Sequence, residues 1–160
     1  METPTTGARF LELRIPPPAV VAIAAALMWA IAALLPSLRV DVPHAGLIAG
    51  ICAALGVAIG GAGLIAFRRA RTTVNPLHPE AASSLVTSGI YRWTRNPMYL
   101  GALPLLAGWA VYLQHPVALL VVPLVMLYLT RFQIIPEERA LSAKFGGQFD
   151  AYRGRVRRWL

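Results

Sequence analysis

The sequence predicts an all-α fold: an integral membrane helical bundle with four transmembrane helices and a cytoplasmic, interfacial helix near the C-terminus. First, 57% of the 160 residues are hydrophobic and only 14% are charged, whereas a soluble domain carries about 25% charged residues. Second, the apolar residues form four blocks, too many for the buried helices of one small soluble core. Third, nearly all cations fall on one side of the predicted membrane. We expect a single membrane domain over 1–160.

The first two blocks, 17–35 and 45–67, contain no charged residue. Both meet the minimum of about 17 apolar residues that a spanning helix needs. They predict a two-helix hairpin over 1–67, and a cytoplasmic connection over 68–96 follows it. The first block is too long for a signal peptide and begins with a Pro-Pro-Pro run, so we expect it to be retained as a span.

The third and fourth blocks, 98–113 and 116–130, are shorter and are separated by little more than a Gln-His pair before a proline. They predict a tight helical hairpin over 97–135. We expect Pro136 to end the last spanning helix, because proline lacks a backbone donor. Within the remainder, 136–160, residues 137–153 are expected to form an amphipathic helix broken near Gly146 and Gly147, which lies in the interface or folds back as a lid. The basic tail that follows indicates an interfacial anchor.

The cations set the orientation. With four spans and a cytoplasmic N-terminus, Arg39 alone lies outside, and cytoplasmic segments hold fourteen of the fifteen Lys and Arg residues. This is the bias expected of a membrane protein. It predicts a multi-pass protein with both termini cytoplasmic, and the Ala- and Gly-rich composition suggests a bacterial inner membrane. The net charge of +8 therefore suits anionic membrane lipids and does not indicate nucleic acid.

The second block carries two Gly-x-x-x-Gly pairs, Gly46 with Gly50 and Gly56 with Gly60. This spacing places a groove of small residues on one helix face and lets another backbone approach closely. The pattern favours packing within the molecule, against the first or fourth span, over a homodimer face.

Several kinds of site are excluded or disfavoured. The nucleophile, phosphate-binding and metalloprotease motifs of soluble enzymes are absent. His44 and His115 belong to the outer side and His78 to the inner side, so these three cannot converge on a metal. Cys52 lies in mid-span, where a thiolate is disfavoured, and is expected to be an apolar packing residue.

Polar and aromatic groups instead gather at the cytoplasmic ends of the last two spans. The segment 88–101 contains Tyr91, Tyr99 and two arginines, and the pair Glu137-Glu138 follows the fourth span. Each part alone has an ordinary explanation: salt bridges of the glutamates with Arg92, Arg95 or Arg139, surface cations, or an aromatic belt. Their co-occurrence indicates a binding site at a membrane surface.

The combined pattern is also specific to a family. The run G-I-Y-R-W-T-R-N-P-M-Y-L-G, a helical hairpin, E-E-x-x-L, F-G and a later Tyr-Arg resemble the integral-membrane methyltransferases of the isoprenylcysteine carboxyl methyltransferase and phospholipid methyltransferase group. The resemblance covers roughly 86–158. Asn96 stands where the family often has His, and Phe149 where it tends to have Tyr, which weakens any transfer of substrate identity.

The resemblance implies S-adenosylmethionine as methyl donor, bound on the cytoplasmic side between the last two spans and a covering C-terminal segment. The catalytic residues it implies are Glu138, Arg95 and Arg153. The cofactor-binding residues it implies are Tyr91, Arg92, Arg95, Asn96, Pro97, Tyr99, Leu100, Gly101, Glu137, Glu138, Phe145 and Tyr152.

The residue chemistry suits such a ligand. Arg95 or Arg92 can pair with its carboxylate, Glu137 or Glu138 can meet its ammonium group, and tyrosine faces can attract its sulfonium. Gly101 would allow close approach of the cofactor or of a helix.

The acceptor implied is lipophilic and enters from the bilayer: a prenylcysteine carboxyl, a phospholipid amine or a small lipophilic molecule. An amine would need Glu138 or Glu137 as a base. A nicotinamide-dependent membrane reductase and a non-enzymatic membrane scaffold are the alternatives.

Overall fold

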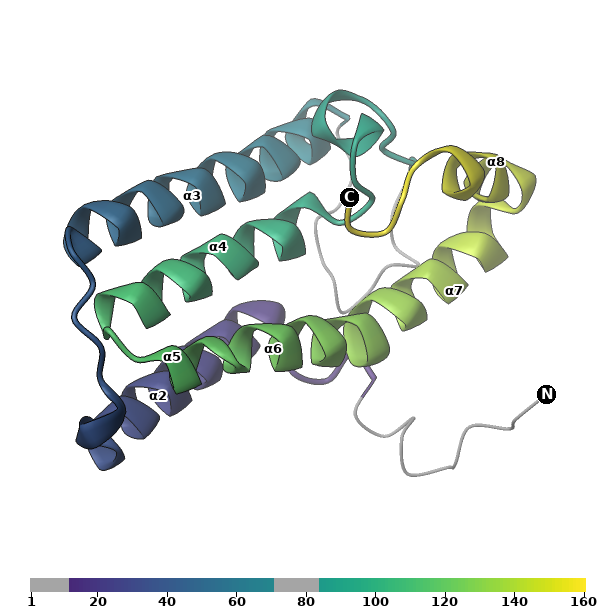
Figure 1. The fold of residues 1–160 in the computed structure, drawn as a ribbon. Helices are drawn as coiled ribbons and strands as arrows, with labels where there is room; N and C mark the ends of the chain where they lie inside the picture. Colours follow the sequence, from purple (N-terminus) through teal and green to yellow (C-terminus); the bar gives the residue numbers. More distant parts are fainter. Residues whose placement is uncertain (1–11, 71–83) are drawn as a thin grey trace.

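The computed structural model describes residues 12–70 and 84–160, and this part of the chain contains helices and turns without any strand (Figure 1). Each long helix corresponds to one of the apolar blocks. The helical elements are α2 (Pro17–Leu34), η1 (Pro36–Leu38), α3 (Ala45–Arg69), η3 (Gly89–Arg92), α4 (Pro97–Tyr112), α5 (Pro116–Leu119), α6 (Val121–Leu129), the π-helical turn η4 (Thr130–Ile134), α7 (Ile135–Phe145) and α8 (Gly147–Arg155).

Three helical stretches in the described residues are long and apolar enough to cross a membrane. They are α2, α3 and the continuous run Pro116–Phe145, whereas α4 is apolar but has only 16 residues. Large side chains such as Leu47, Ile51 and Leu124 are exposed on these helices, which suits contact with lipid. The expected all-helical, apolar bundle is thus confirmed, while four crossings and their orientation stay predictions.

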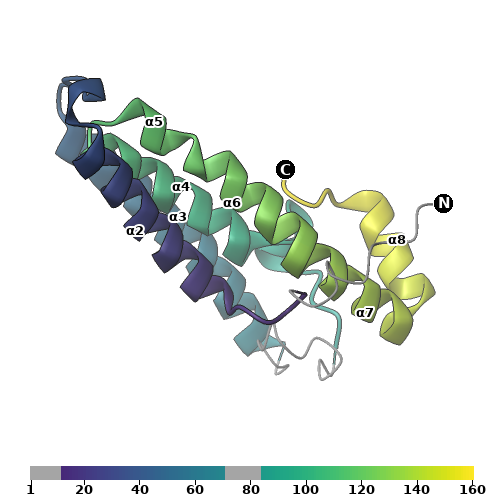
Figure 2. The same ribbon diagram turned by 90° about the horizontal axis from the view of Figure 1, so that it is seen from below.

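The helices pack as a bundle whose two ends differ (Figures 1 and 2). Helix α3 packs along α4, and α2 packs against α4, α5 and α6. The links between α2 and α3 and between α4 and α5 lie at one end. The other end gathers the C-terminal end of α3, the start of α4, helices α7 and α8, and the C-terminus.

Glycines bring α3 and α4 into backbone contact. A Cβ atom added to Gly56 would lie 2.5 Å from the Gly101 carbonyl oxygen, and one added to Gly101 would lie 2.8 Å from the Gly60 nitrogen. Gly46 and Gly50 have no neighbour within 4 Å of such a Cβ atom. Packing of the Gly56/Gly60 pair within the molecule is confirmed, but its partner is the third apolar helix, so the expected first or fourth span is wrong.

The expected helix break at Pro136 is also wrong. Helix α6 runs through the π turn into α7, and the Ile135 N–H donates to the carbonyl of Thr130, five residues earlier. Pro136 cannot donate to the Phe132 carbonyl, and the Leu13 N–H donates to that oxygen instead, at 3.0 Å. A donor from the N-terminal segment therefore satisfies the acceptor that proline leaves free.

The chain does turn at the expected glycines. Helix α7 ends at Phe145, Gly146 has a φ of +51°, and α8 begins at Gly147. Positive φ is accessible to glycine without a Cβ clash. The turn folds α8 back so that Phe149 and Tyr152 are buried in a cluster with Ala66 of α3 and with Tyr91.

Candidate functional site

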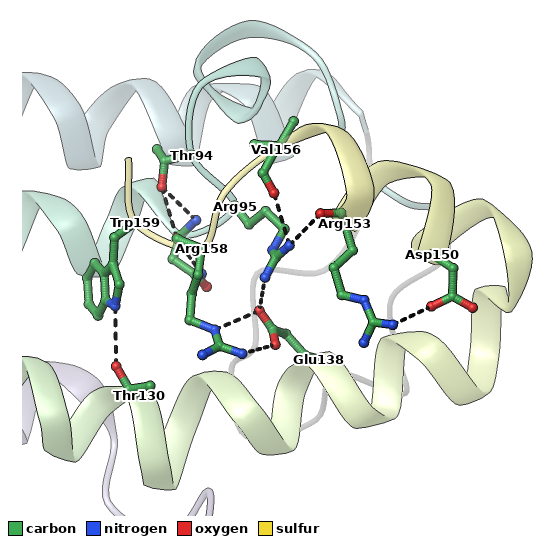
Figure 3. Close-up of polar contacts among 10 residues, drawn as sticks. Thr94, Arg95, Thr130, Glu138, Asp150, Arg153, Val156, Arg158 and Trp159 are labelled. Carbon is green, nitrogen blue, oxygen red and sulfur yellow. Dashed lines mark hydrogen bonds and ion pairs between the residues drawn. The ribbon is translucent and has the colours of Figure 1, made fainter.

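The candidate site lies where the start of α4, helix α7 and the C-terminal tail meet (Figure 3). Glu138 of α7 is its centre, and two guanidinium groups hold it. Arg95 Nη2 donates to Glu138 Oε1 at 2.7 Å, while Arg158 donates from Nε to Oε1 at 3.1 Å and from Nη2 to Oε2 at 2.7 Å. Glu138 therefore carries a compensated charge, with both oxygens engaged.

The tail is held in place through its backbone carbonyls. Arg95 Nη1 donates to the carbonyls of Arg153 and Val156 at 3.0 and 2.9 Å, and the Arg95 N–H donates to that of Arg157 at 3.0 Å. The carbonyl of Arg158 accepts from the side chains of Thr94, at 3.2 Å, and Asn96, at 2.9 Å.

The tail also contacts the last apolar helix. Trp159 is partly buried against the core, and its Nε1–H donates to Thr130 Oγ1 at 3.3 Å. The expectation of a simple interfacial anchor is therefore wrong for Arg158 and Trp159, because both pack back onto the bundle. Arg155 and Arg157 remain exposed.

Glu137 has a different environment from its neighbour. It accepts a short hydrogen bond from the Tyr99 hydroxyl of α4, and no cation of the described residues forms an ion pair with it. The two adjacent glutamates thus differ in charge compensation. Glu138 is paired twice, whereas Glu137 has a hydroxyl as its polar partner.

An aromatic cluster lies beside these carboxylates. The Tyr152 hydroxyl donates to the Tyr91 carbonyl at 2.7 Å, and Phe67 of α3 packs edge-on against the Tyr91 ring. Burial raises the pKa of both Tyr91 and Tyr152, so both phenols stay neutral at physiological pH. The hydrogen bond to Glu138 raises the pKa of Arg158, which therefore stays cationic.

An open cleft of about 510 Å³ borders the ion pairs. Its lining combines the paired Glu138 and Arg158 with cations and small side chains of α7 and α8. The lining residues are Ile135, Glu138, Arg139, Ser142, Ala143, Arg153 and Arg158.

Several residues expected at the site come together there. Besides Arg95 and Glu138, the structure brings Tyr99 to Glu137 and Tyr91 to Tyr152. Asn96 holds the tail. Phe145 lies in the aromatic cluster, with the Lys144 ammonium 5.9 Å from its ring centroid.

Other expected residues lie elsewhere. Arg92 is exposed, and Leu100 is a partly buried residue of α4. Pro97 packs on Gly63 of α3, and Gly101 faces Gly56, so the role seen for Gly101 is helix packing.

Arg153 reaches the site through its carbonyl and lines the cleft, while its side chain pairs with the exposed Asp150 at 3.3 Å. Sequence reasoning missed Arg158 and Thr94. The only signal for Arg158 was a second cation in reach of a glutamate pair, and three other arginines of the same tail offered that signal equally.

The residues present fit a ligand that carries both charges. Arg95 Nε is buried without a partner, and Glu137 pairs with no cation of the described residues. One donor and one carboxyl group are thus left for such a ligand, beside the cleft but outside its lining. In the part of the chain that the structure describes, no group of three His, Cys, Asp or Glu residues could hold a metal ion.

Two comparisons with known proteins bear on this arrangement. A family model described as phospholipid methyltransferase matches residues 45–148, about two thirds of the chain. A Haemophilus influenzae protein named "Uncharacterized protein" is 41% identical over 63 residues, which are 39% of this chain and the whole of that relative. The family match includes Arg95, Glu137 and Glu138 and leaves out α2 and the C-terminal tail.

Proposed function

The chain belongs to the phospholipid methyltransferase family, and on that premise we propose that it transfers a methyl group from S-adenosylmethionine to a lipophilic acceptor in the membrane. The observation that carries the proposal is the unequal pair Glu137 and Glu138. A carboxyl group without a paired cation, beside a neutral aromatic cluster, favours a ligand whose positive charge stabilises its ionised form, and this cofactor has an ammonium and a sulfonium group.

Each group of the site has a role in this proposal. Glu137 receives the ammonium group, and the free Nε of Arg95 donates to the carboxylate. Tyr91 offers a ring to the sulfonium or the adenine. The ion pairs of Glu138 with Arg95 and Arg158 hold the start of α4, helix α7 and the tail together.

The cofactor supplies an activated methyl group, so the protein mainly has to position donor and acceptor. A carboxylate or thiolate acceptor needs no base. An amine acceptor has to lose a proton, and Glu138 does not suit that role, because both of its oxygens already accept from guanidinium groups. The lipid-exposed helices provide the route for an acceptor dissolved in the bilayer.

The test is calorimetric titration of the detergent-purified protein with S-adenosylmethionine, with S-adenosylhomocysteine and with NADPH. We expect saturable binding of the first two, and loss of that binding in Glu137→Gln. Asp41→Asn is the matched control, because Asp41 is an exposed acid beyond the other end of the bundle. Binding of NADPH alone would instead support a reductase. A folded protein that binds none of the three would support a scaffold and overturn the proposal.

A further inference from the structure

We infer that Glu12 is a positioning residue. Its contacts fix the rotation of α7 about the helix axis, and this rotation directs Glu137 and Glu138 into the site. Glu12 lies outside the segment matched by the family model and makes no contact with the site residues it is inferred to position. The ligand-binding part of the inference rests on the proposed function. The conformational part does not.

The π turn η4 is the element that needs support. It contains one residue more than an α-helical turn would, and Pro136 follows it without a backbone donor. Two groups of the segment 12–15 form hydrogen bonds with it. The Leu13 N–H donates to the Phe132 carbonyl at 3.0 Å, and the fully buried Gln133 donates from Nε2 to the Ile15 carbonyl at 2.7 Å.

Glu12 links this turn to α7. Its Oε1 accepts from Arg131 Nη1 at 2.9 Å, within η4, and its Oε2 accepts from Arg139 Nη1 at 3.2 Å, on α7. The Glu12 side chain is only 12% exposed. One carboxylate thus contacts two arginines, and the segment between these arginines contains the end of the π turn, Pro136 and both site glutamates.

The rotation of α7 matters because successive helix residues differ by about 100° around the axis. If η4 relaxed to α-helical geometry, the turn would contain one residue fewer, and every later residue of the helix would shift by one position. Helix α7 would then rotate by about 100° relative to α6. Glu137 would then leave Tyr99, and Glu138 would leave Arg95 and Arg158. Leu13 has a φ of +57°, a conformation that leucine seldom adopts, which indicates that its contacts hold it there.

The experiment compares Glu12→Gln with wild type and with Asp41→Asn as the matched change of charge. Hydrogen exchange of the peptide 130–145, read by mass spectrometry without ligand, reports on the conformation, and the helix 97–112 is the internal reference. Calorimetric titration with S-adenosylmethionine reports on the site. We expect Glu12→Gln to speed exchange in 130–145 and to weaken binding roughly three- to tenfold, the scale of two partly exposed ion pairs.

The internal reference separates positioning from general destabilisation. A general loss of stability would speed exchange in the helix 97–112 as well as in 130–145, whereas loss of the Glu12 contacts should speed it in 130–145 alone. Unchanged exchange in Glu12→Gln would overturn the inference, as would faster exchange with wild-type affinity. A wild type that does not bind S-adenosylmethionine, with Glu12→Gln still speeding exchange only in 130–145, would refute the proposed function and support the conformational inference.

Discussion

Two neighbouring substitutions of oxygen by NH2, Glu138→Gln and Glu137→Gln, should differ in their effect on stability: only the first should lower it. Glu138 is 12% exposed and accepts three hydrogen bonds from Arg95 and Arg158. The glutamine keeps one carbonyl acceptor and loses the charge, so two guanidinium groups remain together without an anion. Glu137 pairs with no cation of the described residues, and its glutamine variant can still accept from the Tyr99 hydroxyl.

The magnitude follows from these contacts. Removing one partner of a buried ion pair costs about 3–5 kcal/mol. Arg95 is 9% exposed but Arg158 is 34% exposed, and exposed pairs contribute much less. We therefore expect Glu138→Gln to lower the free energy of unfolding by about 2–3 kcal/mol. At about 2–4 °C per kcal/mol for a chain of this size, the melting temperature should fall by about 4–12 °C.

Glu137→Gln replaces a partly buried carboxyl group that has no paired cation, so it should leave the melting temperature unchanged or raise it. The assay is thermal unfolding in one detergent, followed by intrinsic fluorescence, with Asp41→Asn as the control. The reasoning is refuted if Glu138→Gln melts within about 2 °C of wild type, or if Glu137→Gln loses as much stability as Glu138→Gln.

Two further predictions concern packing and pH. Gly56→Ala should lower the free energy of unfolding by about 2–3 kcal/mol, because its Cβ would lie 2.5 Å from the Gly101 carbonyl oxygen. Gly46→Ala on the same helix has open space and should be neutral or stabilise by up to about 1 kcal/mol, and thermal unfolding of both variants checks the difference. Burial tends to raise the pKa of Glu12, but hydrogen bonds and charges of Arg131 and Arg139 outweigh burial and hold it below its usual 4.5. A group whose pKa is lower in the folded state stabilises the fold at pH values above its unfolded-state pKa. The difference in melting temperature between wild type and Glu12→Gln should therefore stay constant above pH 4.5 and shrink as the pH falls further. A difference that persists in acid would contradict this.

The apolar helices could be predicted closely because each is a local pattern. The expected blocks 17–35, 45–67 and 98–113 agree within two residues with the ends of α2, α3 and α4. Pro136 misled the prediction because its compensation is not local. The hydrogen bond to the Phe132 carbonyl comes from the N–H of Leu13, which is far away in the sequence. Nothing near the proline therefore indicates that the helix continues.

In the site, too, local features could be predicted and contacts between distant segments could not. Arg95, Tyr99 and the two glutamates stand out in the sequence as polar groups at the ends of apolar helices. Which Gly-x-x-x-Gly pair is packed, and which tail arginine reaches Glu138, depends on the path of the chain in space. Gly46 and Gly56 have identical spacing to their partners in the sequence, and Arg157 and Arg158 are adjacent cations of which Arg158 pairs with Glu138.

The shortness of α4 has a consequence for the depth of the site. Its 16 residues span about 24 Å at 1.5 Å per residue, about 6 Å less than a typical hydrocarbon layer. If α4 is a membrane crossing, as the sequence predicts, such a hydrophobic mismatch would be relieved by local thinning of the bilayer. Arg95 and Asn96 precede α4 directly, so polar headgroups and water should be drawn inward around them. A lipid could then present its headgroup to the site while its acyl chains remain in the membrane.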